Sequence, residues 1–330
     1  MEPERAYHSE LSKASAVKRR HRQWFQSIPG LTSVGVSVQA DGAGCIVVTF
    51  ASRETIENVI SQAIIPPVLD GVKVVIEDEP ATFELATDTS RYRPAIGGCS
   101  ISSPTATGTL GGWVRDRING YMCIISCEHV LDVTNNLGAN IIQPSALHDG
   151  GNANNDMIAV NLRGIRDLDY DCAIARVVSE ATLANLSTSY CGVMAERSIA
   201  HDDNRPTQQT IWYGHGGLPY IGEHVEKRGR TTELTEGTVE RLDVDLVDQQ
   251  QNPMITDVFE IESVDQNNFV EGGDSGSLVT QVGSHSVRGL LTATRADNGR
   301  FGYAQHWNKV AERLQLDPTY HVIQHHAQYW

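Results

Sequence analysis

Hydrophobic positions from residue 96 onward come in short runs separated by turn-forming residues, and in many runs apolar and polar positions alternate. A period of two is typical of strands with one buried face, and regularly spaced runs of this kind are typical of all-β folds. Examples are TLGGWVRD, YMCIISC, DCAIARVV, DVFEIESV and VRGLLTAT. The pattern predicts a mostly β barrel or sandwich over residues 96–315 and disfavours alternating βα units.

The first part of the chain has a different pattern. Apolar residues near helical spacing predict a helix over residues 3–27, with the basic cluster KRRHR at residues 18–22 as its solvated face. Two strand-like runs, a helical segment and a further strand follow, so residues 1–79 are interpreted as a small α+β domain. Turn and breaker residues at 80–95 predict a linker, and residues 316–330 are a C-terminal tail.

Composition and charge narrow the class of protein. The chain has 330 residues and a formal net charge of -15, which disfavours a nucleic-acid partner because an acidic surface repels phosphates. It contains neither an apolar run of about 18 residues nor an apolar segment behind a basic start, so we expect a cytoplasmic protein without a signal peptide or membrane partner. The six cysteines form no CxxC pair and are expected to be free thiols: Cys45, Cys99, Cys123, Cys127, Cys172 and Cys191.

The segment EGGDSGS at residues 271–277 is the first candidate for chemistry. Glycine adopts backbone angles closed to other residues, so the N–H groups of Gly273 and Ser275 can converge beside the Ser275 hydroxyl. Such a turn predicts Ser275 as a nucleophile, with these two N–H groups as its oxyanion hole. A glycine-rich hairpin turn is the alternative interpretation of the segment taken alone.

A serine nucleophile needs a base and an acid that orients the base. The strand-like run YMCIISC ends just before His129, whereas most other histidines lie in polar or turn-rich surroundings, so His129 is the predicted base. In LDYDCAIARV, Asp171 has the strand parity of two alanines, which leave room for an imidazole. Asp171 is therefore the predicted orienting acid, and Asp169, which has the same parity, is the alternative.

At these residues the sequence resembles the chymotrypsin-like (trypsin-like) serine peptidases, whose catalytic residues follow the order His, Asp, Ser. CEHVL is similar to that family's histidine box, DCAIARV to its aspartate strand and GGDSGS to its serine box, and KRGRTTELTEGTVERLDVDL resembles the opening of the second barrel in streptogrisin and α-lytic-type members. SCEHVLDVTNN and IIQPSALHDGG carry a narrower resemblance to the intracellular group of plant narrow-leaf regulators and bacterial relatives.

The resemblance implies a chymotrypsin-like double β-barrel of two six-stranded antiparallel barrels, here preceded by the small α+β domain, and it requires no metal or organic cofactor. By analogy of position it also implies a substrate pocket lined by Phe269, Thr292, Ala293 and Thr294. Because no acid stands at Phe269, a small or medium apolar substrate side chain is expected unless Asp297 reaches the pocket.

Asp274 is expected to have a structural role, bonding to the backbone or to a nearby basic group. In secreted trypsin-like zymogens, cleavage creates a new N-terminus that pairs with the acid before the serine. Here Pro94 follows Arg93 in RYRPAIGG, and a proline at that position blocks most trypsin-like cleavage. The acid must therefore find its partner within the uncut chain.

These patterns together predict a serine endopeptidase that acts on protein or peptide substrates. The alternatives are a weakly active or inactive protease-fold scaffold that binds peptides or partner proteins, and a latent protease activated by a partner. Every catalytic candidate lies after residue 95, and a unit as small as residues 1–79 commonly gains stability by docking on a neighbour. We therefore expect the N-terminal domain to serve assembly, as in a homo-oligomer, or regulation.

Overall fold

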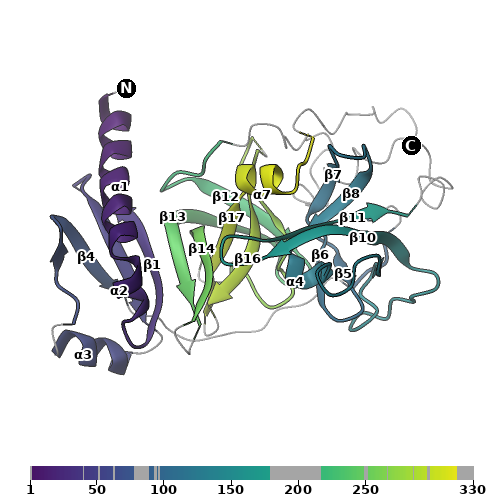
Figure 1. Cartoon of the computed structure of the whole chain (residues 1–330), viewed down its shortest axis with the longest axis horizontal. Helices are drawn as coiled ribbons and strands as arrows, with labels where there is room; N and C mark the ends of the chain where they lie inside the picture. The colour runs from purple at the N-terminus through teal and green to yellow at the C-terminus, as the bar shows by residue number, and fades with distance from the viewer. Residues whose placement is uncertain are drawn as a thin grey trace.

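The computed structural model describes residues 2–39, 41–50, 53–61, 64–77, 89–92, 95, 97–178, 217–248, 252–265, 267–284, 286–295 and 298–317. Over these ranges the strands form one ten-stranded and one seven-stranded sheet, which lie beside each other in Figure 1. The predicted fold class, a mostly β chain with two β units behind a small α+β unit, is confirmed. None of the helices in the described ranges is long and apolar enough to cross a membrane.

Six strands of the larger sheet close into a barrel. In their order around the barrel they are β12 (His224–Gly229), β15 (Leu278–Gln281), β16 (Val287–Arg295), β17 (Asn298–His306), β14 (Pro253–Ser263) and β13 (Glu233–Val247). Each neighbouring pair is antiparallel, and the pairing of β13 with β12 closes the ring. Buried apolar side chains fill the interior, among them Val225, Val239, Phe259, Ile261, Phe269 and Leu291.

The seven-stranded sheet forms the other β unit. In sheet order its strands are β6 (Thr107–Thr109), β5 (Ser100–Ser102), β9 (Asn140–Ile142), β10 (Met157–Arg166), β11 (Asp171–Val177), β8 (Met122–Ser126) and β7 (Gly112–Arg115). The resemblance implied a second closed barrel. Over the described residues no hydrogen-bonded ladder joins the edge strands β6 and β7, so this sheet is not closed by hydrogen bonds. The two edges are consecutive in the chain, and only residues 110 and 111 separate them.

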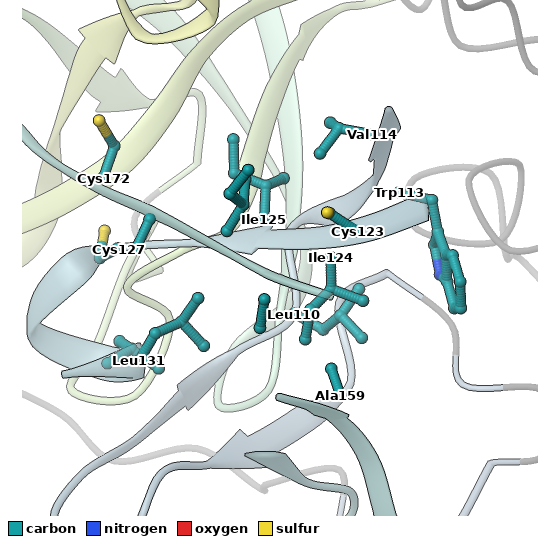
Figure 2. Close-up of a cluster of buried hydrophobic side chains, with 14 of the residues drawn as sticks. Leu110, Trp113, Val114, Cys123, Ile124, Ile125, Cys127, Leu131, Ala159 and Cys172 are labelled. Carbon is teal, nitrogen blue, oxygen red and sulfur yellow. The ribbon is translucent and has the colours of Figure 1, made fainter. Parts of the chain in front are cut away.

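A buried apolar cluster fills this second unit and holds four of the cysteines, three of which are labelled in Figure 2 (Cys123, Cys127 and Cys172). Burial raises the pKa of the Cys123 thiol to about 12, so this group stays protonated and packs as a small hydrophobe. The five cysteines in the described residues are free and buried, which confirms the prediction for them. Cys191 lies outside the described residues.

The N-terminal unit joins the closed barrel edge to edge. It consists of α1 (Glu2–Arg20), α2 (Arg22–Gln26), β1 (Leu31–Val38), β2 (Gly44–Phe50), α3 (Arg53–Ser61), β3 (Val68–Leu69) and β4 (Val72–Glu77). β1 pairs antiparallel with β13, with Ser33 opposite Leu246, so one sheet runs from this unit into the barrel. Figure 1 shows α1 alongside β1. The unit has its own apolar core, and most of the predicted linker lies outside the described residues.

The basic cluster at the C-terminal end of α1 is solvated only in part: the Arg19 and Arg20 side chains are 63% and 65% exposed, as predicted, whereas Lys18 is not. The single helix predicted over residues 3–27 is divided at His21. Lys18 is fully buried, and its Nζ lies 3.2 Å from an oxygen of Asp243 and 3.5 Å from an oxygen of Asp245. Arg22 donates to both oxygens of Asp245, at 2.7 and 3.1 Å. The prediction was wrong for Lys18, because Asp243 and Asp245 on β13 compensate the cost of burying its charge.

The chain after β17 continues into a short helix, α7 (Trp307–Arg313), in agreement with the helical pattern of NKVAERLQL. Trp307, Val310 and Leu314 pack into the core of the seven-stranded unit, which ties the end of the closed barrel to the other β unit. The tail beyond residue 317, with its three histidines, lies outside the described residues.

Candidate active site

His129 and Asp171 are placed together by strand pairing. β8 ends at Ser126, and His129 lies in the first turn of the short helix α4 (Glu128–Leu131) that follows. Asp171 begins β11, which pairs antiparallel with β8 so that Ala173 lies opposite Ser126. A run of fully buried side chains in β8 and β11 fixes this register, because a shift by one residue would turn the apolar face outward.

Asp171 holds both the ring and the backbone of His129. Nδ1 of His129 lies 2.5 Å from Asp171 Oδ2, and the His129 N–H donates to Asp171 Oδ1 at 3.0 Å. A ring nitrogen bound to a carboxylate carries the proton, so Nε2 is left to accept one. The His129 side chain is 28% exposed, so part of the ring is accessible to solvent.

The carboxylate of Asp171 is kept charged by its neighbours. Burial by itself raises the pKa of this carboxyl, but hydrogen bonds from His129 and Thr292 outweigh burial and lower the pKa below its ordinary value. Thr292 Oγ1 donates to Asp171 Oδ2 at 2.8 Å. The Gln305 side chain pairs with the Asp171 backbone through two hydrogen bonds of 2.7 and 2.8 Å. The alternative acid, Asp169, instead accepts from Thr256 Oγ1 at 2.7 Å.

Ser275 lies in a loop bound between the two β units. Its carbonyl accepts from the Thr109 N–H at 2.9 Å, and the next residue, Gly276, donates to Leu291 O at 2.9 Å. A Cβ on Gly276 would lie 2.0 Å from Ser126 Oγ, so the loop contacts the segment that leads to His129. In the part of the chain that the structure describes, no hydrogen bond joins the Ser275 hydroxyl to the His129 ring. In enzymes without bound substrate, the hydrogen bond between nucleophile and base is often long and forms fully only when the substrate binds.

Two backbone N–H groups are available beside Ser275. Among the described residues, neither the Gly273 N–H nor the Ser275 N–H donates to a protein acceptor. Gly273 has φ +102°, a region that residues with a Cβ rarely adopt, and a Cβ there would lie 2.7 Å from Thr231 Oγ1. The sequence pattern predicted these two donors, and the structure leaves both without a partner.

Asp274 is fully buried and anchors the loop. Its carboxylate accepts from the N–H of Thr231 at 2.8 Å, of Thr232 at 3.2 Å and of Glu271 at 3.0 Å, and from Thr232 Oγ1 at 2.6 Å. Lys227 Nζ, also fully buried, lies 3.2 Å away. Burial lowers the pKa of Lys227, and the charge of Asp274 opposes that shift. The predicted structural role for Asp274, with backbone and basic partners, is confirmed.

The four residues predicted to line the substrate pocket differ in burial and in their contacts. Phe269 is fully buried in the barrel core and lies under Lys227, whose Nζ is 5.7 Å from the ring centre. Thr292 is 7% exposed and is bound to Asp171. Ala293 and Thr294 follow on β16 and are half-buried. Asp297 lies outside the described residues.

Cys127, His129 and Asp171 offer ligand atoms that all lie within 4.8 Å of one another. A thiol must lose its proton to bind a metal ion. Burial raises the pKa of Cys127 well above its ordinary value, and its Sγ donates to Leu291 O at 3.1 Å. Since Asp171 is already bound to His129 and Thr292, this group of side chains is poorly suited to a metal ion.

No protein-family model matches this chain. No curated protein matches it either. Among solved structures it is similar to a glutamic-acid-specific serine protease that uses a histidine triad in substrate binding, with 16% identity, 67% of this chain and 98% of that chain covered, and a TM-score of 0.48. It is also similar to protease A of Thermobifida fusca and to a Nocardiopsis protease. Each match has 15% identity and a TM-score of 0.47, and covers 67% of this chain and 96% of the other. At this identity the likeness concerns the fold alone.

Proposed function

We propose that this protein is a serine endopeptidase, with Ser275 as nucleophile, His129 as base and Asp171 as the acid that orients it. The observation that supports the proposal most is the pair of hydrogen bonds that the backbone N–H and Nδ1 of His129 donate to the Asp171 carboxylate, which fixes the imidazole with Nε2 free to accept a proton. The N–H groups of Gly273 and Ser275, which have no acceptor among the described residues, add the donors that acyl transfer requires.

The reaction follows from these groups. His129 Nε2 takes the proton of the Ser275 hydroxyl as Oγ attacks the substrate carbonyl carbon, and the carbonyl oxygen gains the negative charge. The N–H groups of Gly273 and Ser275 bind that oxyanion, while Asp171 stabilises the imidazolium. The imidazolium then gives its proton to the leaving amine, the C–N bond breaks, and an acyl group remains on Ser275. Water, activated by the same imidazole, releases the acid product.

The substrate side chain is proposed to lie against β16, beside Ala293 and Thr294, which are half-buried. Phe269 is buried in the barrel core and is left out of this proposed pocket, and a small or medium apolar side chain remains the expected preference beside Ala293 and Thr294. The narrower likeness to the intracellular plant and bacterial group, the cytoplasmic location and the assembly role of residues 1–79 stay predictions.

The test is hydrolysis of fluorescein-labelled casein by the wild-type chain and by Ser275→Ala. Loss of the nucleophile is expected to lower the rate by about 10⁴ to 10⁶ without changing the melting temperature. Ser284→Ala, which removes an exposed hydroxyl in the turn after β15, is the matched control and should retain the wild-type rate. Casein hydrolysis that persists in Ser275→Ala would contradict the proposal, and a folded wild type without any hydrolysis would favour the scaffold alternative.

A further inference from the structure

The peptide group between Gly272 and Gly273 carries one of the two proposed oxyanion donors, and steric contacts on its Gly272 side do little to fix it. Both residues that flank it are glycines, so rotation of this peptide plane meets no Cβ on either side. Around Gly272 a Cβ would meet nothing within 4 Å. A hydrogen bond must therefore hold this peptide if the Gly273 N–H is to keep one direction.

The Thr231 side chain supplies such a bond. Its Oγ1 donates to the Gly272 carbonyl at 2.8 Å, and within the described ranges this is the one donor to that oxygen. In a trans peptide the carbonyl and the N–H point in opposite directions. Anchoring the Gly272 oxygen to Thr231 therefore turns the Gly273 N–H to the opposite side, where no described residue accepts from it.

We propose that Thr231 is a positioning residue for the oxyanion hole, acting through its hydroxyl on the Gly272–Gly273 peptide. The inference rests on the proposed peptidase function. Thr231 is 7% exposed and does not reach the substrate; it fixes a donor that does. Without the hydroxyl, the peptide samples orientations in which the Gly273 N–H no longer faces the developing oxyanion.

Other hydrogen bonds keep the Ser275 loop in place, so the Thr231 hydroxyl can be removed without unfolding the loop. Thr109 Oγ1 donates to the next carbonyl, that of Gly273, at 2.8 Å, and the Thr109 N–H donates to the Ser275 carbonyl. The bond from Thr231 to Asp274 comes from the backbone N–H and survives any side-chain substitution. A Thr231 variant that lacks only the hydroxyl should therefore keep the loop folded and release a single peptide plane.

The experiment measures the acylation step with p-nitrophenyl acetate in a stopped-flow instrument, using the full chain. The burst of p-nitrophenolate separates the acylation rate constant from the apparent dissociation constant of the ester. Thr231→Val is expected to lower the acylation rate constant by about 10- to 100-fold, less than the 10²- to 10³-fold loss of a whole oxyanion donor, with the dissociation constant unchanged. Thr231→Ser, which keeps the hydroxyl, should restore the wild-type constant.

Thr235→Val is the matched control. Thr235 Oγ1 donates to the Phe269 carbonyl at 2.8 Å, so this variant removes a similar hydroxyl-to-carbonyl bond that does not hold the oxyanion peptide. It should acylate at the wild-type rate. If Thr231→Val does not fold, Thr231→Ala is compared with Thr231→Ser in its place.

The outcomes separate the two proposals. A wild-type chain that shows no burst and no acetyl group on Ser275 would overturn the peptidase proposal itself. A wild-type burst with a Thr231→Val acylation constant within about threefold of it would overturn only the positioning role, because a misdirected donor costs more than this. Equal losses in Thr231→Val and Thr231→Ser would also overturn it, since the hydroxyl would not be the cause.

Discussion

Replacing Lys227 by methionine should destabilise the loop that carries Ser275. Methionine is unbranched and apolar, so it can fill most of the space of the lysine side chain without bringing a charge. Lys227 Nζ and the Asp274 carboxylate are both fully buried and 3.2 Å apart. Removing the cation leaves a buried carboxylate without its counter-charge.

The size of the effect follows from what remains around Asp274. Removing one partner of a buried ion pair commonly costs about 3–5 kcal/mol in the free energy of unfolding. Four hydrogen bonds from Glu271, Thr231 and Thr232 still solvate the carboxylate, so the lower end, about 3 kcal/mol, is expected. For a domain of about 150–250 residues this corresponds to a fall of about 6–12 °C in melting temperature.

Urea unfolding followed by tryptophan fluorescence measures the loss, with Lys309→Met as control. Lys309 pairs with Asp257, but its side chain is 35% exposed, so removing it should cost less than about 1 kcal/mol. A Lys227→Met free energy of unfolding within about 1 kcal/mol of wild type would refute the reasoning, because the carboxylate would then not need its buried counter-charge.

Three further predictions concern other parts of the molecule. Asp171→Asn should lower casein hydrolysis by about 10⁴ and Asp169→Asn should have little effect, measured by initial rates; the reverse order would move the acid to Asp169. Folding lowers the pKa of Asp171, so the charged carboxylate stabilises the folded state at neutral pH, and this stabilisation is lost as the pH falls through the lowered pKa. The difference in the free energy of unfolding between wild type and Asp171→Asn, measured in urea, should therefore shrink below about pH 4. A chain that starts near residue 95 uncovers the β13 edge and the carboxylate of Asp243, so it should unfold at a lower temperature or aggregate, whereas an unchanged melting temperature and light-scattering mass would contradict this.

The sequence predicted those parts of the site that depend on local pattern. His129 follows a buried apolar strand and Asp171 begins another, and the strand parity of Asp171 already indicates which way its side chain points. The glycines around Ser275 likewise indicate an unusual turn, and Gly273 has the expected positive φ. The β class followed from short alternating runs.

Contacts between distant segments could not be predicted in this way. Arg19 and Asp243 are 224 positions apart, and only the pairing of β1 with β13 shows that the basic cluster at the end of α1 faces acids. The same holds for Thr292, which binds Asp171 from another strand, and for Thr231, whose partner is a backbone carbonyl. A threonine in a strand or turn gives no local signal that its hydroxyl holds a distant group.

Ser275 is proposed to be a nucleophile that His129 activates. The most direct measurement is reaction of the intact chain with a fluorophosphonate probe, followed by mass spectrometry of the labelled peptide, with His129→Ala compared in parallel. The proposal predicts one label per chain on Ser275, and loss of labelling in a folded His129→Ala variant. A folded wild type that stays unlabelled, or that carries the label on another serine, would contradict it.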